Sequence, residues 1–97
     1  MNWISQYMRD REAELERLTD AIRMISQLIE EARSDARADY SEGVEELVEL
    51  REEIRSSIDD LGWAEPGEWL DVANHVEKLL SRLRRNLDRT ADWFALT

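Results

Sequence analysis

The chain has 97 residues, of which 42% are hydrophobic and 37% are charged, and its formal net charge is −10. It contains no cysteine, which excludes disulfides and thiolate metal sites, and its negative charge disfavours direct binding to DNA, RNA or an anionic membrane.

The composition predicts a single all-α domain over residues 1–97. Three glycines and one proline are too few for the many turns of an all-β fold. No segment approaches the roughly 18 consecutive apolar residues of a membrane span, and the first ten residues carry no basic region followed by an apolar core. We therefore expect a cytoplasmic protein that does not bind a membrane.

A heptad pattern of apolar residues predicts a long first helix over about residues 3–36. A repeat that averages 3.5 residues buries one side of a helix against other helices, as in a coiled coil. One series of seam positions is Ile4, Arg11, Leu18, Ile25 and Ala32, and the other is Met8, Leu15, Ile22, Ile29 and Ala36.

The end of this first helix is weakly marked in the sequence. Residues 34–43 lower the helix propensity without a proline, so one continuous helix up to residue 61 is an alternative. The apolar stripe changes phase here, however, and Asp39 with Glu42 fits a capping box. We predict a second helix over about residues 40–61, with an apolar stripe at Tyr40, Val44, Leu47, Arg51, Ile54, Ile58 and Leu61.

Gly62 and Pro66 predict a sharp turn after the second helix. A glycine can end a helix in the left-handed conformation, and a proline restricts the residue before it. A third helix should follow over about residues 67–94. Its apolar stripe is Trp69, Ala73, Val76, Leu80, Leu83, Leu87, Thr90 and Phe94.

Short connections between these helices predict an antiparallel three-helix bundle with coiled-coil-like packing. At about 1.5 Å per residue, the first helix would be roughly 50 Å long and the others roughly 33 and 40 Å. Its amino-terminal end would then project beyond the other two helices and expose an apolar cluster. Because exposed apolar clusters mark interfaces, we expect a homodimer. The expected interface residues are Trp3, Ile4, Tyr7 and Met8 on the projecting end, together with Trp93.

Negative charge is concentrated on the second helix. Residues 39–67 contain ten acidic residues and two arginines, whereas residues 68–97 are balanced. Surface pairing with Lys78, Arg82 and Arg85 of the third helix is one interpretation. The other is an acidic face that binds a basic protein and could mimic nucleic acid. That face would be formed by Glu42, Glu45, Glu46, Glu49 and Glu53.

Two acidic pairs resemble the Glu-x-x-Glu and Glu-x-x-Asp signature of the MazG-like all-α nucleoside triphosphate pyrophosphohydrolases. The pairs are Glu46 with Glu49, and Glu68 with Asp71. The resemblance implies an enzyme in which these four carboxylates hold Mg²⁺ against the phosphates of a nucleotide. The predicted bundle places Glu49 level with residue 79, roughly 16 Å along the axis from Glu68, which argues against a shared ion.

The remaining patterns do not point to catalysis. His75 shares a helical face with Glu68 and Asp71, and we interpret it as a surface histidine beside Asp71. The sequence has no thiol, no Gly-x-Ser-x-Gly turn and no glycine-rich phosphate loop. We therefore expect a non-enzymatic interaction module without catalytic residues, metal or cofactor. The MazG-like enzyme and a structural or assembly role are the alternatives.

Overall fold

Three long α-helices make up the fold. The computed structural model describes the backbone of residues 3–31 and 34–96, and the side chains of residues 3–31 and 40–92. Helix α1 spans Trp3–Glu31, α2 spans Ser34–Trp63 and α3 spans Trp69–Leu96, with a short 3-10 helix, η1, at Pro66–Glu68. These described residues contain no strand, so the predicted all-α fold is confirmed.

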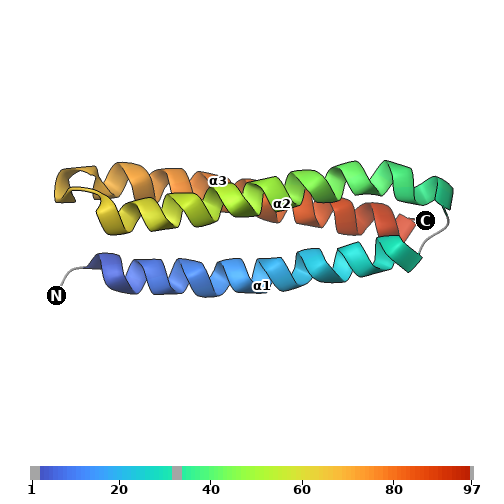
Figure 1. Cartoon of the computed structure of the whole chain (residues 1–97), viewed down its shortest axis with the longest axis horizontal. Helices are drawn as coiled ribbons and strands as arrows, with labels where there is room; N and C mark the ends of the chain where they lie inside the picture. The colour runs from blue at the N-terminus through green and yellow to red at the C-terminus, as the bar shows by residue number, and fades with distance from the viewer. Residues whose placement is uncertain (1–2, 32–33, 97) are drawn as a thin grey trace.

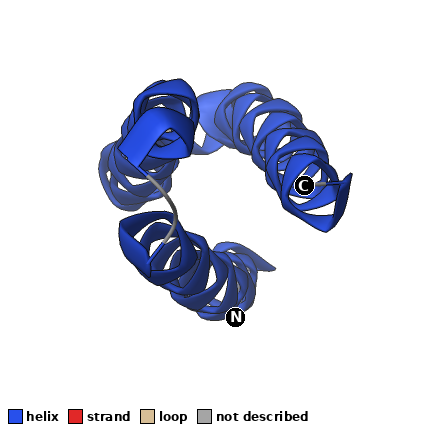
Figure 2. Cartoon of the chain, turned by 90° about the vertical axis from the view of Figure 1, so that its right-hand side faces the viewer, coloured by secondary structure: helices blue, strands red, loops and turns tan. Residues whose placement is uncertain are grey.

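The helices lie side by side in a rod whose Cα atoms extend over 51 × 18 × 17 Å (Figure 1). Helices α1 and α3 run in the same direction, and α2 runs against both. Viewed along the rod, α2 lies between α1 and α3 (Figure 2), and each of these packs more closely on α2 than on the other. The predicted three-helix bundle is confirmed. Among the described helices, none is both long enough and apolar enough to cross a membrane.

The predicted boundary between the first two helices, at residues 36–40, is wrong. Helix α1 extends to Glu31 and α2 begins at Ser34, and the two helices run in opposite directions (Figure 1), so a continuous helix up to residue 61 is excluded as well. The weak helix propensity of residues 34–43 costs only tenths of a kcal/mol for most residues. Packing along the whole of α1 and α2 contributes more than this, because tertiary contacts supply most of the stability of a helix in a protein.

The expected amino-terminal overhang does not exist. The three helices have nearly equal lengths of 29, 30 and 28 residues, so α1 is matched along its length by its neighbours. Ile4 is only 5% exposed, and Met8 is half-buried against the hydrophobic core. Ile4 and Met8, two of the residues that we expected to drive dimerisation, are therefore packed against their own chain, whereas Trp3 remains 46% exposed.

The second turn lies where the sequence predicts it, but Gly62 does not end α2. Helix α2 continues past Gly62, and no glycine in the described residues has a positive φ. Helix α2 ends at Trp63, and Glu65 is extended at φ −71° and ψ 150° because Pro66 follows it. The indole Nε1 of Trp69 donates to the carbonyl oxygen of Ala64 at 3.1 Å, which ties the start of α3 to the turn.

The core lies along the facing sides of the three helices, where the heptad stripes predicted it. The largest fully buried side chains, each less than 2% exposed, all belong to α2 and α3. They are Leu47, Ile54, Ile58, Leu61, Val76, Leu80 and Leu83. Helix α1 adds Leu15, Ile22 and Ile29 to the same cluster. Ile25 also belongs to this cluster and Leu18 packs against it, and both residues line the cavity between α1 and α3.

Replacing Gly43 with alanine is expected to raise the free energy of unfolding by about 1 kcal/mol. Gly43 lies within α2, its φ is not positive, and an added Cβ would meet nothing within 4 Å. Alanine keeps the helical backbone and loses less conformational entropy on folding. Urea unfolding followed by far-ultraviolet circular dichroism measures the change, and a Gly43→Ala variant less stable than the parent chain would contradict the prediction.

Candidate functional site

The five predicted glutamates form an exposed face of α2. Residues 42, 46, 49 and 53 recur at helical spacing on one side of the helix, with residue 45 beside them. All five side chains are exposed, and none of them makes an ion pair within 4.0 Å in the described part of the chain. We call Glu42, Glu45, Glu46, Glu49 and Glu53 the acidic face.

A shallow cavity of about 260 Å³ lies between the acidic face and α3. It is lined by Glu46, Glu49, Leu50 and Glu53 of α2 and by Arg82 and Asn86 of α3. Along the axis of the bundle, Arg82 therefore lies level with the acidic face, as the sequence predicts. The expected surface pairing is not found, because no described ion pair connects the acidic face with Lys78, Arg82 or Arg85. The negative charge of the acidic face is therefore not neutralised by any described ion pair.

The four carboxylates of the MazG-like alternative are not brought together. Glu46 and Glu49 face Arg82 across the cavity, whereas Glu68 and Asp71 lie at the turn that begins α3. In the described residues, no group of three or more histidine, aspartate or glutamate side chains could hold a metal ion. The geometry therefore lacks the Mg²⁺ site that the resemblance implies.

Tyr7 links α1 to α3 through its phenol. The hydroxyl lies 3.1 Å from the carbonyl oxygen of Ala73 and 2.8 Å from Oε2 of Glu77, so its one proton can be donated to either acceptor. Burial raises the pKa of the Tyr7 phenol, and the hydrogen bond to Glu77 and the charge of Glu77 raise it further. The burial and the Glu77 carboxylate therefore both favour the neutral, proton-donating form of this tyrosine.

Charged side chains continue this link toward the middle of the rod. One guanidinium nitrogen of Arg11 lies 3.2 Å from a carboxylate oxygen of Glu14 and 3.4 Å from one of Glu77. The same guanidinium lies over the Tyr7 ring, 5.4 Å from its centroid. Arg84 of α3 donates through Nε to Glu14 at 2.7 Å. These contacts align α1 with α3 in one register, and we call Tyr7, Arg11, Glu14, Glu77 and Arg84 the α1–α3 network.

The remaining predicted interface residues have different surroundings. Trp3 is 46% exposed and makes edge-on contacts with Tyr7 and Trp69, at centroid distances of 5.7 and 6.3 Å. Ile4 belongs to the core. Trp93 lies outside the residues whose side chains the structure describes. Of the five predicted interface residues, Trp3 is the one that the structure describes as exposed.

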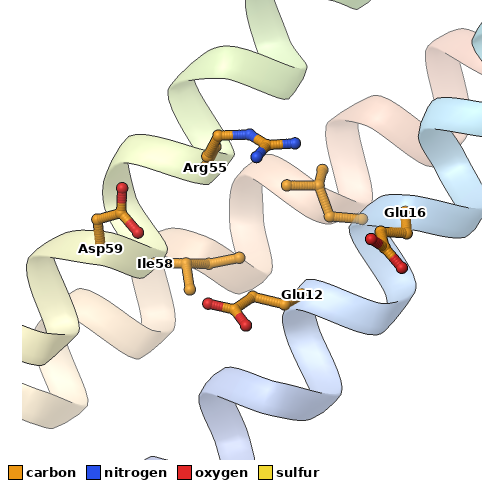
Figure 3. Close-up of a pocket in the computed structure, with 6 residues that line it drawn as sticks. Glu12, Glu16, Arg55, Ile58 and Asp59 are labelled. Atoms are coloured by element: carbon orange, nitrogen blue, oxygen red, sulfur yellow. The ribbon is translucent and has the colours of Figure 1, made fainter.

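A second cavity, of about 300 Å³, lies between α1 and α2 (Figure 3). It is lined by Glu12, Leu15, Glu16, Arg55, Ile58 and Asp59. Figure 3 shows the Arg55 side chain reaching from α2 toward α1, while Ile58 and Glu12 approach each other below it. Its lining is a mixed-charge surface over two core residues, Leu15 and Ile58, and none of the six lining residues carries a hydroxyl, thiol, imidazole or amine side chain.

The sequence carries a signal for only part of the α1–α3 network. Arg11 stands out because it interrupts an apolar seam, and a glutamate three residues later is a local partner. Glu77 and Arg84 give no such signal, because they lie on α3. Only the parallel placement of α1 and α3 brings these side chains to Arg11 and Glu14.

Comparison with known proteins assigns no function to this chain. No protein family, no curated protein and no solved structure matches it. The interpretation of the acidic face and of the α1–α3 network therefore depends on their own geometry and charge.

Proposed function

We propose that this protein is a non-enzymatic interaction module whose acidic face binds a basic surface of another protein. The observation that carries the proposal is the set of five exposed glutamates on α2, none of which has a described ion pair. Carboxylates left without partners on one face create a local negative potential, which attracts and orients a positively charged partner.

The spacing of these charges supports a nucleic-acid mimic. Residues 42–53 extend over about 16 Å of helix axis at about 1.5 Å per residue. Five charges over that length give roughly one per 4 Å, close to the one per about 3.4 Å along a single strand of B-DNA. A protein surface that binds phosphates through lysine and arginine would therefore meet a similar row of charges on α2.

A charge-neutralised variant tests the proposal. In this variant all five residues of the acidic face are changed to glutamine, which keeps the helix propensity similar. The probe is a labelled arginine-rich peptide that binds duplex DNA, and fluorescence anisotropy gives its dissociation constant at about 50 and about 200 mM salt. We expect the variant to bind at least about tenfold more weakly and to show a smaller salt dependence than the parent chain.

A matched control separates the acidic face from net charge. It carries glutamine at five other exposed glutamates without described ion pairs: Glu12, Glu16, Glu30, Glu31 and Glu65. This control has the same net charge as the first variant and should retain binding within about threefold. Equal weakening of the two variants would mean that only total charge matters, and the proposed face would be wrong.

Competition tests the mimicry itself. The parent protein should displace duplex DNA from the same peptide, and the variant without the acidic face should not. Binding of protein and DNA to the peptide at the same time would contradict nucleic-acid mimicry.

A further inference from the structure

The exposed large apolar side chains are concentrated on one side of the molecule. Six large hydrophobic residues are exposed in the described part of the chain, and helical spacing places four of them on the side where α1 and α3 face each other. These four are 46–67% exposed: Trp3, Met24 and Leu28 on α1, and Leu70 on α3. The other two, Val48 and Trp63, lie on α2. We call the side that carries the four residues the α1/α3 face.

The carboxyl-terminal half of this groove is mostly apolar. A cavity of about 240 Å³ is lined by Leu18, Ala21 and Ile25 of α1 and by Leu87 and Ala91 of α3, and the charged side chains of Arg84 and Asp88 complete the lining. Met24 and Leu28 follow Ala21 by three and seven residues, so they lie on the same side of α1 as the lining residues. Viewed along the rod, this is the open side of the arc of helices (Figure 2).

The opposite end of the face is also apolar. Leu70 precedes Glu77 by seven residues, and Glu77 contacts Tyr7 of α1, so Leu70 lies on the side of α3 that is turned toward α1. Trp3 contacts Trp69 edge-on and remains half-exposed beside it. Each end of the α1/α3 face therefore presents bulky apolar side chains to solvent.

Charged residues separate the two apolar ends. Glu14 and Arg84 of the α1–α3 network pair across the middle of the groove. A face with apolar residues at both ends and opposite charges between them is self-complementary under a twofold axis through its middle.

We propose that a second copy of this chain covers the α1/α3 face and forms an antiparallel homodimer. The twofold axis crosses the middle of the face, at right angles to the rod. Met24 and Leu28 of one copy then pack against Trp3 and Leu70 of the other. Methionine suits such a contact because its flexible thioether adapts to irregular surfaces. This interface differs from the one expected at an amino-terminal overhang. It does not use the acidic face, so it is independent of the proposed function.

The distribution of charge supports a second copy at this position. Each chain carries a net charge of −10, and residues 39–67 account for most of it. Helix α2 lies opposite the open side of the arc (Figure 2), so a dimer through α1 and α3 keeps the two α2 helices apart. Residues 18–28 carry one acidic and one basic residue, and residues 84–91 carry three arginines and one aspartate. Repulsion between the copies is therefore smallest on this side.

The size of the face also fits a dimer. The long side of the rod measures 51 × 18 Å between Cα atoms. The area of a rectangle of this size is comparable to the roughly 800 Å² that each partner buries in a standard interface. An antiparallel arrangement uses the full length of this side, because each apolar end meets the other apolar end.

Analytical ultracentrifugation tests the dimer. The parent chain should sediment as two chains at about 100 µM. A triple variant, Met24→Gln, Leu28→Gln and Leu70→Gln, should keep its helical circular dichroism because these side chains are exposed. Its dimer dissociation constant should rise at least about 100-fold, because apolar anchors carry most of the energy of an interface.

The matched control changes the two exposed apolar residues outside the face, Val48→Gln and Trp63→Gln. This control should remain dimeric. A parent chain that stays monomeric at about 100 µM would overturn the proposal. So would a triple variant that dimerises as strongly as the control.

Cross-linking tests the antiparallel orientation. The chain has no cysteine, so Leu28→Cys chains and Leu70→Cys chains can be mixed and joined by a short bismaleimide. Products that join position 28 of one copy to position 70 of the other should dominate. A dominant product between two Leu28→Cys chains would mean that the copies are parallel and would overturn the proposed geometry.

Discussion

Replacing Leu80 with alanine is expected to lower the free energy of unfolding by about 2–5 kcal/mol. Leu80 is 0% exposed and belongs to the core cluster that joins the three helices. The change removes buried methyl and methylene groups and leaves a cavity that the surrounding helices refill only in part. Because domains of this kind are stable by only about 5–15 kcal/mol, the loss is large. Urea unfolding at one protein concentration measures it.

Two valines provide the control for this prediction. Val76 is 0% exposed and Val48 is 38% exposed, so Val76→Ala and Val48→Ala delete the same atoms from the core and from the surface. We expect Val76→Ala to destabilise by about 1–3 kcal/mol and Val48→Ala by less than about 0.5 kcal/mol. Similar losses at Leu80, Val76 and Val48 would mean that the core has been assigned incorrectly.

Replacing Glu77 with alanine is expected to lower the free energy of unfolding by about 1–2 kcal/mol. The change removes the carboxylate that accepts from Tyr7 and Arg11. Arg11 keeps Glu14 as a partner, and the Glu77 side chain is 49% exposed, so solvent limits the loss. Glu12→Ala is the control, because Glu12 is exposed and has no described ion pair.

The same variant should change the dependence of stability on pH. Burial and Glu77 raise the pKa of Tyr7 above its usual value, so the folded protein keeps the phenol proton at a pH where the unfolded chain releases it. Stability from this tyrosine is therefore fully present below about pH 10 and is lost as the pH rises above that value. Glu77→Ala should reduce this alkaline loss, because it removes the hydrogen bond and the charge that favour the neutral phenol.

Ultraviolet absorbance of ionised tyrosine measures the titration, and the difference between the parent chain and a Tyr7→Phe variant isolates Tyr7. The pKa of Tyr7 should fall in Glu77→Ala but stay raised, since burial is the larger cause. An unchanged titration would show that Glu77 does not act on the phenol.

The acidic face was predicted from the sequence because both of its determinants are local. The spacing of the glutamates within one helix decides that they share a side. Their position outside the apolar stripe of α2 decides that this side meets solvent. The sequence could not predict in this way that Arg82 forms no described ion pair with the acidic face. That outcome depends on how α2 and α3 are rotated against each other.

By itself, the sequence determined the three amphipathic segments, their apolar stripes and the acidic side of the second helix. Each of these features repeats within a single helix, so it can be recognised without knowledge of the neighbouring helices. Only the tertiary structure decided that α1 ends at Glu31 and that Ile4 and Met8 are covered. Helix propensities near the first turn differ by only tenths of a kcal/mol, whereas packing accumulates along entire helices of matched length. The same packing brought Leu18 and Ile25 of α1 to the groove with α3 and left the α1/α3 face exposed.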